Sequence, residues 1–83
     1  MTVDFYEGGD LMTNSAEVRA RIDSLGLRYN YLAQQLGLTP YGLALKINNT
    51  NEFKISEVAR LCELLNIKSL KERDRIFFAK NVE

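Results

Sequence analysis

Apolar residues recur at helical spacing in five short segments of the chain, and glycines or polar residues separate these segments. The first segment begins at Asn14, with Glu17 three residues further on, which is the spacing of a capping box. It ends at Gly26, a residue that favours helix C-termini because it adopts a positive φ without steric strain. The segments expected to be helical are 15–25, 29–36, 40–48, 55–65 and a short one that Ser69 and Glu72 open. The chain is therefore expected to be an all-α single domain with five helices.

The same spacing predicts which side chains form the core. In the first segment Val18, Ile22 and Leu25 share one helical face. The other residues expected to point inward are Leu32, Ala33, Leu36, Leu43, Ile47, Val58, Leu61, Cys62 and Leu65. Near the end of the chain, Phe77 and Phe78 are expected to pack on this core rather than form a seam between two subunits.

The middle of the chain has the spacing of a helix-turn-helix. Ala33 lies where two helices approach closely, Gly37 allows a tight turn, and Leu43 packs back against the first helix of the pair. Thr39 is placed to cap the second helix, and Pro40 occupies its first position, where a missing N–H does no harm. With one helix before this pair and two after it, the pattern is typical of a DNA-binding helix-turn-helix domain.

From about Ser15 onward the chain resembles the Cro and repressor-type (XRE-like) helix-turn-helix regulators of temperate bacteriophages. A narrower similarity, to the small modulator-of-repression (antirepressor) regulators of lactococcal phages, rests on the run LALKINNTNEFKISEVARLCELLNI and the later IFFAKNVE. The resemblance covers the chain after Met12 and none of residues 1–11. It implies a five-helix, lambda-repressor/Cro-like fold and a role in choosing between lysis and lysogeny in a bacterial host.

Composition narrows the function to binding. The 83 residues include 11 Lys and Arg, 11 Asp and Glu, one Cys and no His, so the formal net charge is zero. That balance excludes a generally cationic coat for nucleic acid, and the lack of His and of a second Cys excludes ordinary zinc, haem, disulfide and catalytic-triad chemistry. No apolar run is long enough to span a bilayer, and no segment has the layout of a signal peptide. We therefore expect a cytoplasmic, non-enzymatic protein with no cofactor, no metal, no membrane partner and no small-molecule substrate.

Residues 1–11 differ from the rest, since they carry three acids, no base and no helical or strand period. The run from Glu7 to Asp10 can be encoded by codons that contain a bacterial ribosome-binding sequence, at a normal spacing before the codon of Met12. Our hypothesis is that 1–11 is an unstructured, translated leader, that Met12 is the native start, and that 12–83 is the helix-turn-helix domain. Without the three acids of the leader, the domain has 11 bases against 8 acids, a net charge of +3 on 72 residues.

The resemblance also indicates which surface family members use to bind DNA. Four positions of the expected third helix match those whose side chains read base edges: Pro40, Tyr41, Ala44 and Leu45. Asn48 points outward with them, and Tyr29 matches the phosphate-contacting start of the second helix. Between residues 27 and 48 the only charged residues are Arg28 and Lys46. Because bases are read by hydrogen bonds and phosphates by cations, this surface predicts weak DNA binding on its own.

The same surface has a second interpretation. An outward Tyr41 and Leu45, beside Pro40 and Ala44, make a small apolar and aromatic patch, which is typical of protein-binding sites. A helix-turn-helix with such a face would cover the matching surface of a phage repressor and block it from its operator, in keeping with the antirepressor resemblance. The first hypothesis is therefore an antirepressor that binds the N-terminal DNA-binding domain of the repressor.

Three alternatives stay open. In the first, the protein is a Cro-type repressor that binds operator DNA directly, as a dimer. In the second, it forms a co-repressor complex on DNA together with the repressor. In the third, Tyr41 and Leu45 are ordinary exposed apolar residues. Charges elsewhere are expected to be solvated, including Glu57 and Glu63 on one helix face. The same holds for a late basic cluster, which could instead contact the DNA backbone or an acidic partner: Lys68, Lys71, Arg73 and Arg75.

Overall fold

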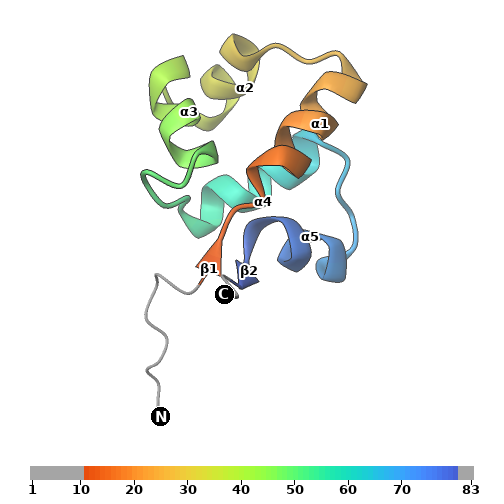
Figure 1. Ribbon diagram of the computed structural model, residues 1–83. Helices are drawn as coiled ribbons and strands as arrows, with labels where there is room; N and C mark the ends of the chain where they lie inside the picture. Colours follow the sequence, from red (N-terminus) through yellow and green to blue (C-terminus); the bar gives the residue numbers. More distant parts are fainter. Residues whose placement is uncertain (1–10, 81–83) are drawn as a thin grey trace.

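Five helices and one short ladder make up the part of the chain that the structure describes, residues 11–80 (Figure 1). In this computed structural model the helices are α1 (Ser15–Leu25), α2 (Tyr29–Leu36), α3 (Pro40–Ile47), α4 (Ile55–Leu64) and α5 (Leu70–Phe77). The strands β1 (Leu11–Met12) and β2 (Ala79–Lys80) pair antiparallel and join the two ends of this region. The expected all-α class is confirmed. None of the helices in this range is long and apolar enough to cross a membrane.

Local capping residues end the helices close to where the sequence pattern predicts. Asn14 accepts a hydrogen bond from the backbone N–H of Glu17 at 3.2 Å, and Gly26 ends α1 with a φ of 68°. α3 ends at Ile47 and α4 at Leu64. Each helix is therefore one residue shorter than the segment that the sequence predicts. No glycine marks these two ends, so the sequence holds no sharp stop signal there.

The capping box expected at Ser69 is half present. Ser69 Oγ accepts a hydrogen bond from the backbone N–H of Glu72 at 3.1 Å. The carboxylate of Glu72 pairs with Arg21 of α1 rather than with the backbone N–H of Ser69. A contact between distant helices has therefore replaced one half of a local motif.

Side chains from all five helices form one core. Its buried members are Val18, Ile22, Leu32, Ala33, Leu43, Ile47, Val58, Leu61, Cys62, Leu65, Ile67, Ile76 and Phe77. Phe77 lies edge-on to Phe53, with ring centroids 5.8 Å apart, and Phe78 is partly buried against the same cluster, so the late apolar segment packs on the core as expected. The prediction for Leu25 is wrong, because this last residue of α1 is 40% exposed and Leu27 packs against the core instead.

The described region begins inside the expected leader. Leu11, the last residue of that segment, pairs with Lys80 in the ladder, and Met12 pairs with Ala79. Leu11 is thus part of the ladder. The rest of the expected leader, residues 1–10, lies outside the described residues, and a native start at Met12 stays a prediction.

The segment before α1 is joined to the end of α3 by side-chain hydrogen bonds. The Asn49 carboxamide accepts from the N–H of Thr13 at 2.8 Å and donates to the Thr13 carbonyl at 2.9 Å. Ser15 Oγ donates to the carbonyl of Ile47, the last residue of α3. Asn49 has a φ of 68°, a left-handed conformation that Asn tolerates better than most residues. Since Thr13 is buried, its backbone groups would lose both partners if the carboxamide were removed.

We expect Asn49→Ala to lower the free energy of unfolding by about 2 to 3 kcal/mol, because it leaves the buried N–H and carbonyl of Thr13 unpaired. Asn66→Ala is the matched control: Asn66 also has a positive φ, of 63°, but its side chain makes no hydrogen bond within residues 11–80. Urea unfolding followed by circular dichroism measures both variants. Equal losses in the two would contradict a stabilising role for the contacts to Thr13.

Candidate functional site

α2 and α3 are joined by a tight turn that begins with Gly37. This glycine has a φ of 72°, and its N–H donates to the carbonyl of Gln34 at 3.1 Å. The N–H of Leu38 donates to the carbonyl of Ala33 at 2.8 Å, and the two bonds together form a Schellman motif. Glycine is favoured at this position because a side chain on a left-handed residue is strained.

α3 starts directly after this turn. Thr39 Oγ1 accepts the N–H of Gly42 at 2.9 Å, and Pro40 is the first helical residue, as the sequence predicts. Ala33 of α2 and Leu43 of α3 are both fully buried, which the spacing also predicts. Local signals therefore account for both helices and for the turn between them.

The structure divides the eight candidate site residues into two groups. The exposed ones are Arg28, Pro40, Tyr41 and Asn48. The half-buried ones are Tyr29, Ala44, Leu45 and Lys46. The exposed part of the expected apolar patch is therefore smaller than predicted, and its main side chain is Tyr41, which is 73% exposed.

Leu45, which is expected to point outward, is only half exposed. The N–H groups of Thr50 and Asn51 donate to the carbonyl of Leu45 at 2.9 and 3.2 Å, so the loop after α3 folds back against its last turn. Tyr29 is also partly buried, because its side chain packs against the core. Both outcomes depend on the path of neighbouring segments, which helical spacing alone does not give.

Lys46 is held in an ion pair that the sequence did not reveal. Its Nζ lies 2.6 Å from Oε1 of Glu57 on α4, and the two side chains are only 12% and 9% exposed. Glu57 Oε1 also accepts the backbone N–H of Lys54 at 2.9 Å. The prediction that Glu57 is solvated is therefore wrong. Lys46 is not exposed to solvent either, and its contact with a partner stays a prediction. The spacing of Lys54 and Glu57, from N-cap to third helical residue, was the available signal.

Two opposing effects act on the pKa of Glu57. Burial works to raise this pKa, while the hydrogen bonds from Lys46 Nζ and from the Lys54 N–H work to lower it. The hydrogen bonds prevail, so the pKa of Glu57 lies below its ordinary value. Glu57 is therefore a carboxylate at neutral pH, and the pair with Lys46 is ionic.

The two other polar candidates differ in their surroundings. The side-chain oxygen of Asn48 accepts a hydrogen bond from the Arg19 guanidinium, so Asn48 is exposed but oriented by α1. Arg28 is exposed at the N-cap of α2, where its side chain makes no capping hydrogen bond. Arg28 is thus the one candidate cation that stays accessible.

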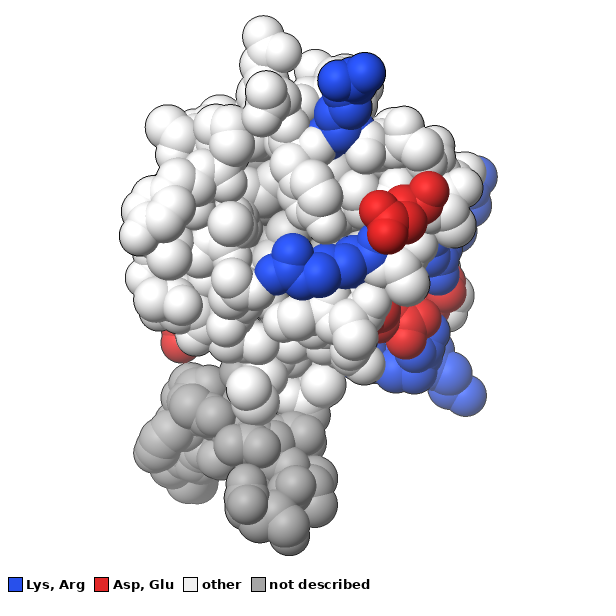
Figure 2. Space-filling model, turned by 45° about the horizontal axis from the view of Figure 1, so that its top comes forward, with Lys and Arg blue, Asp and Glu red and all other residues white. Residues whose placement is uncertain are grey.

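From residue 29 to residue 51 the sequence has a single charged residue, Lys46, and that residue is paired. We call the exposed side chains of this stretch the uncharged surface: Asn30, Tyr31, Gln34, Thr39, Pro40, Tyr41 and residues 48–51. Figure 2 shows a face of the molecule that is mostly white on its left, while most acids and bases lie toward its right and one basic side chain crosses the middle.

Sequence reasoning missed Tyr31, which is 43% exposed on α2. Asn30, Tyr31 and Gln34 are all exposed and lie on the helix side away from the buried Leu32 and Ala33. A helical wheel of this segment would have indicated the position. The uncharged surface therefore presents two tyrosines rather than one.

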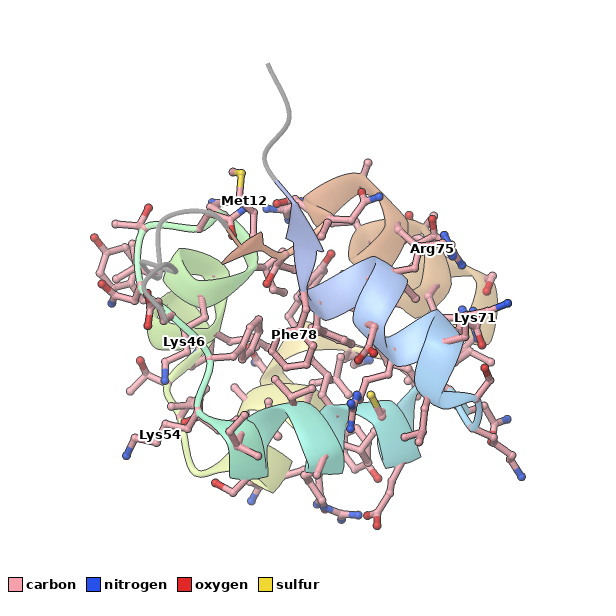
Figure 3. All side chains as sticks on the ribbon, turned by 90° about the horizontal axis from the view of Figure 1, so that it is seen from below. Met12, Lys46, Lys54, Lys71, Arg75 and Phe78 are labelled. Atoms are coloured by element: carbon pink, nitrogen blue, oxygen red, sulfur yellow. The ribbon has the colours of Figure 1, made fainter. Side chains whose placement is uncertain are left out.

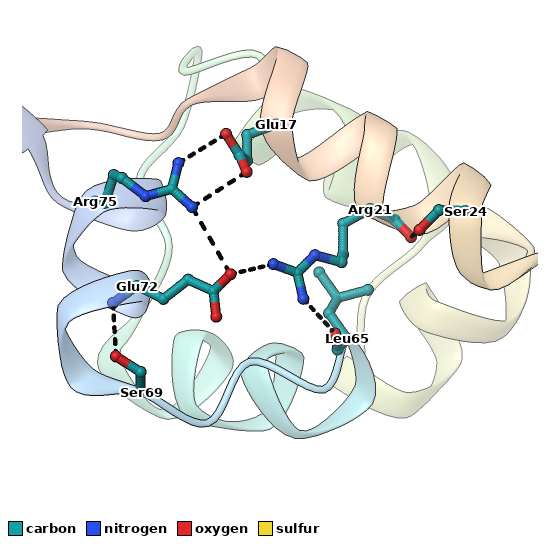
Figure 4. A network of polar contacts seen from close by, with 7 residues as sticks. All are labelled: Glu17, Arg21, Ser24, Leu65, Ser69, Glu72 and Arg75. Atoms are coloured by element: carbon teal, nitrogen blue, oxygen red, sulfur yellow. Dashed lines mark hydrogen bonds and ion pairs between the residues drawn. The ribbon is translucent and has the colours of Figure 1, made fainter.

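Charges on the other side of the molecule are paired between α1 and α5 (Figure 4). Arg75 donates to both oxygens of Glu17 at 2.9 and 3.2 Å, and Glu72 pairs with Arg21. The hydrogen bond from Arg75 lowers the pKa of Glu17 below its ordinary value. Arg73 pairs with its neighbour Asp74.

The late basic cluster is thus half neutralised by these contacts. Within residues 11–80, Lys68 and Lys71 have no ion pair and are exposed, as expected for solvated charges.

Among the described residues, no three His, Cys, Asp or Glu side chains gather closely enough to hold a metal ion. No protein-family model matches the chain, and no curated protein or solved structure matches it either.

We expect Lys46→Met to lower the free energy of unfolding at pH 7 by about 3 kcal/mol, because it leaves the buried Glu57 carboxylate without its cation. Lys54→Met, at an exposed lysine nearby (Figure 3), is the control and should change stability by less than about 0.5 kcal/mol.

The difference in the free energy of unfolding between Lys46→Met and the wild type should become smaller in acid. In the wild type the folded pKa of Glu57 is lowered, so its contribution is present above the ordinary value of 4.5 and is lost as the pH falls through the folded pKa. In the variant the buried carboxylate takes up a proton at higher pH. Chemical unfolding between pH 3 and pH 7 measures this, and a difference that does not change with pH would contradict it.

Proposed function

We propose that this protein is a phage transcription regulator of the choice between lysis and lysogeny, and that it acts as an antirepressor in the cytoplasm of the bacterial host. In this proposal α2, the Gly37 turn and α3 form a helix-turn-helix that binds the DNA-binding domain of the phage repressor. The observation that carries the proposal is the surface chemistry of α3. Its large exposed side chain is Tyr41, and its single cation, Lys46, is paired with Glu57.

Direct reading of DNA is poorly supported by this surface. Base edges are discriminated by hydrogen-bonding side chains, but the exposed positions at the start of α3 are Pro40 and Tyr41. Phosphate contacts add affinity through counterion release, and each needs an accessible cation. Within α2, α3 and the turn between them the only cation is Lys46, which is paired with Glu57, and Arg28 is exposed directly before α2.

A protein partner is better supported. Tyrosine is enriched at protein interfaces because it provides a large, rigid contact area together with one polar group. Tyr31 and Tyr41 belong to a stretch of chain whose other exposed side chains are neutral amides, hydroxyls and a proline. None of these side chains is itself charged, so a partner that covers them desolvates no charge of their own. The family resemblance identifies the expected partner as the repressor.

We expect Tyr41→Ala to weaken the complex with the repressor's N-terminal domain by about 2 kcal/mol, roughly 30-fold in Kd, without unfolding the protein. Tyr41 is 73% exposed, so its removal leaves no cavity, whereas a change at the half-buried Leu45 would mix folding with binding. Leu70→Ala, at a residue 68% exposed at the start of α5, is the control. Isothermal titration calorimetry measures both, and full affinity in Tyr41→Ala would refute the assignment.

Gel shifts with the operator region separate the antirepressor from its alternatives. We expect no shift with this protein alone at physiological salt, a shift with the repressor alone, and loss of that shift when both are mixed. A shift by this protein alone, falling steeply with salt, would instead indicate a Cro-type repressor. A shift that needs both proteins would indicate a co-repressor complex.

A further inference from the structure

The buried ion pair between α3 and α4 adjoins the proposed binding surface. Lys46 follows Leu45 on α3, and its ammonium lies 2.6 Å from Glu57. Its side chain is 12% exposed, although lysine is the residue that most readily extends its charge into water along a flexible stem. The inward position of this ammonium therefore depends on an acceptor that holds it there.

Glu57 is suited to be that acceptor. Its carboxylate is fixed independently by the N–H of Lys54 at 2.9 Å, within the first turn of α4. The N-terminus of a helix also favours a negative charge, because the backbone N–H groups there lack partners. Glu57 therefore stays in place without Lys46, and Lys46 is the member of the pair that is captured.

We propose that Glu57 is a specificity-determining residue, which withholds the Lys46 ammonium from the binding surface and so disfavours nucleic acid as a ligand of this face. The inference rests on the proposed function, in which the face binds a protein. If the ammonium were released, it would extend from α3 into solvent beside the uncharged surface and supply one phosphate contact. Burying the ammonium also spares a neutral protein partner from having to desolvate it.

The test uses Glu57→Gln, because glutamine keeps an oxygen for the Lys54 N–H but removes the charge that holds Lys46. Binding to a fluorescent DNA duplex of arbitrary sequence is measured by anisotropy over a series of salt concentrations. We expect Glu57→Gln to bind severalfold more tightly than wild type at low salt. The slope of log K against log salt should become steeper by about 0.9, the value for one added phosphate contact.

Two further variants separate this effect from net charge. Glu63→Gln removes the same charge from the same helix and also breaks an ion pair, but its partner Arg60 is already 43% exposed. We expect Glu63→Gln to bind DNA as the wild type does. The double variant Lys46→Gln/Glu57→Gln should return to wild-type binding. Equal gains in Glu57→Gln and Glu63→Gln, or no gain in Glu57→Gln, would overturn the proposal.

A measurement on the unmodified protein covers the case in which Glu57→Gln does not fold. Brief acylation of lysines followed by mass spectrometry should modify Lys46 severalfold more slowly than the exposed Lys54, Lys68 and Lys71. Acylation of Lys46 at the same rate as Lys54 would overturn the proposal. Failure of the wild type to bind the repressor domain would refute the proposed function alone, since the comparisons with DNA and the acylation rates do not depend on it.

Discussion

The placement of α3 depends on the pairing of the Asn49 carboxamide with the backbone of Thr13. This contact joins residues 36 positions apart and ties the loop after α3 to the segment before α1. Ser15 adds a hydrogen bond to the last carbonyl of α3, and the N–H of Asn14 donates to the carbonyl of Ile76 at the end of α5. The short stretch 13–15 therefore joins the ends of three helices, and the exposed position of Tyr41 depends on this anchored frame.

The parts of the fold that follow from neighbouring residues could be predicted from the sequence. Asn14, Gly26, Gly37 and Thr39 each act within a few residues, so their spacing fixed the ends of α1, the start of α3 and the turn between α2 and α3. What depends on tertiary neighbours could not be predicted in this way. The capture of Lys46 by a residue of α4 has no signature within α3 itself.

The distribution of charge carries more information here than its sum. A net charge of zero argues against a protein that coats nucleic acid through a general positive charge, but it does not give the charge of any single face. In the described region the ion pairs between helices join α1 to α5 and α3 to α4, and α2 and α3 have no charged residue of their own besides Lys46. Under the proposed function, this arrangement would favour a protein over DNA by the absence of charge rather than by a charge of the opposite sign.

The two-residue ladder has a practical consequence for engineering. Both ends of the described region meet there, with β1 beside β2, while α2 lies at the far side of the domain (Figure 1). A fluorescent protein or a second copy of the domain, fused through a flexible linker directly to β1 or β2, would be attached on the side away from α2. Tandem fusions and surface-immobilised forms could therefore be made without covering Tyr31.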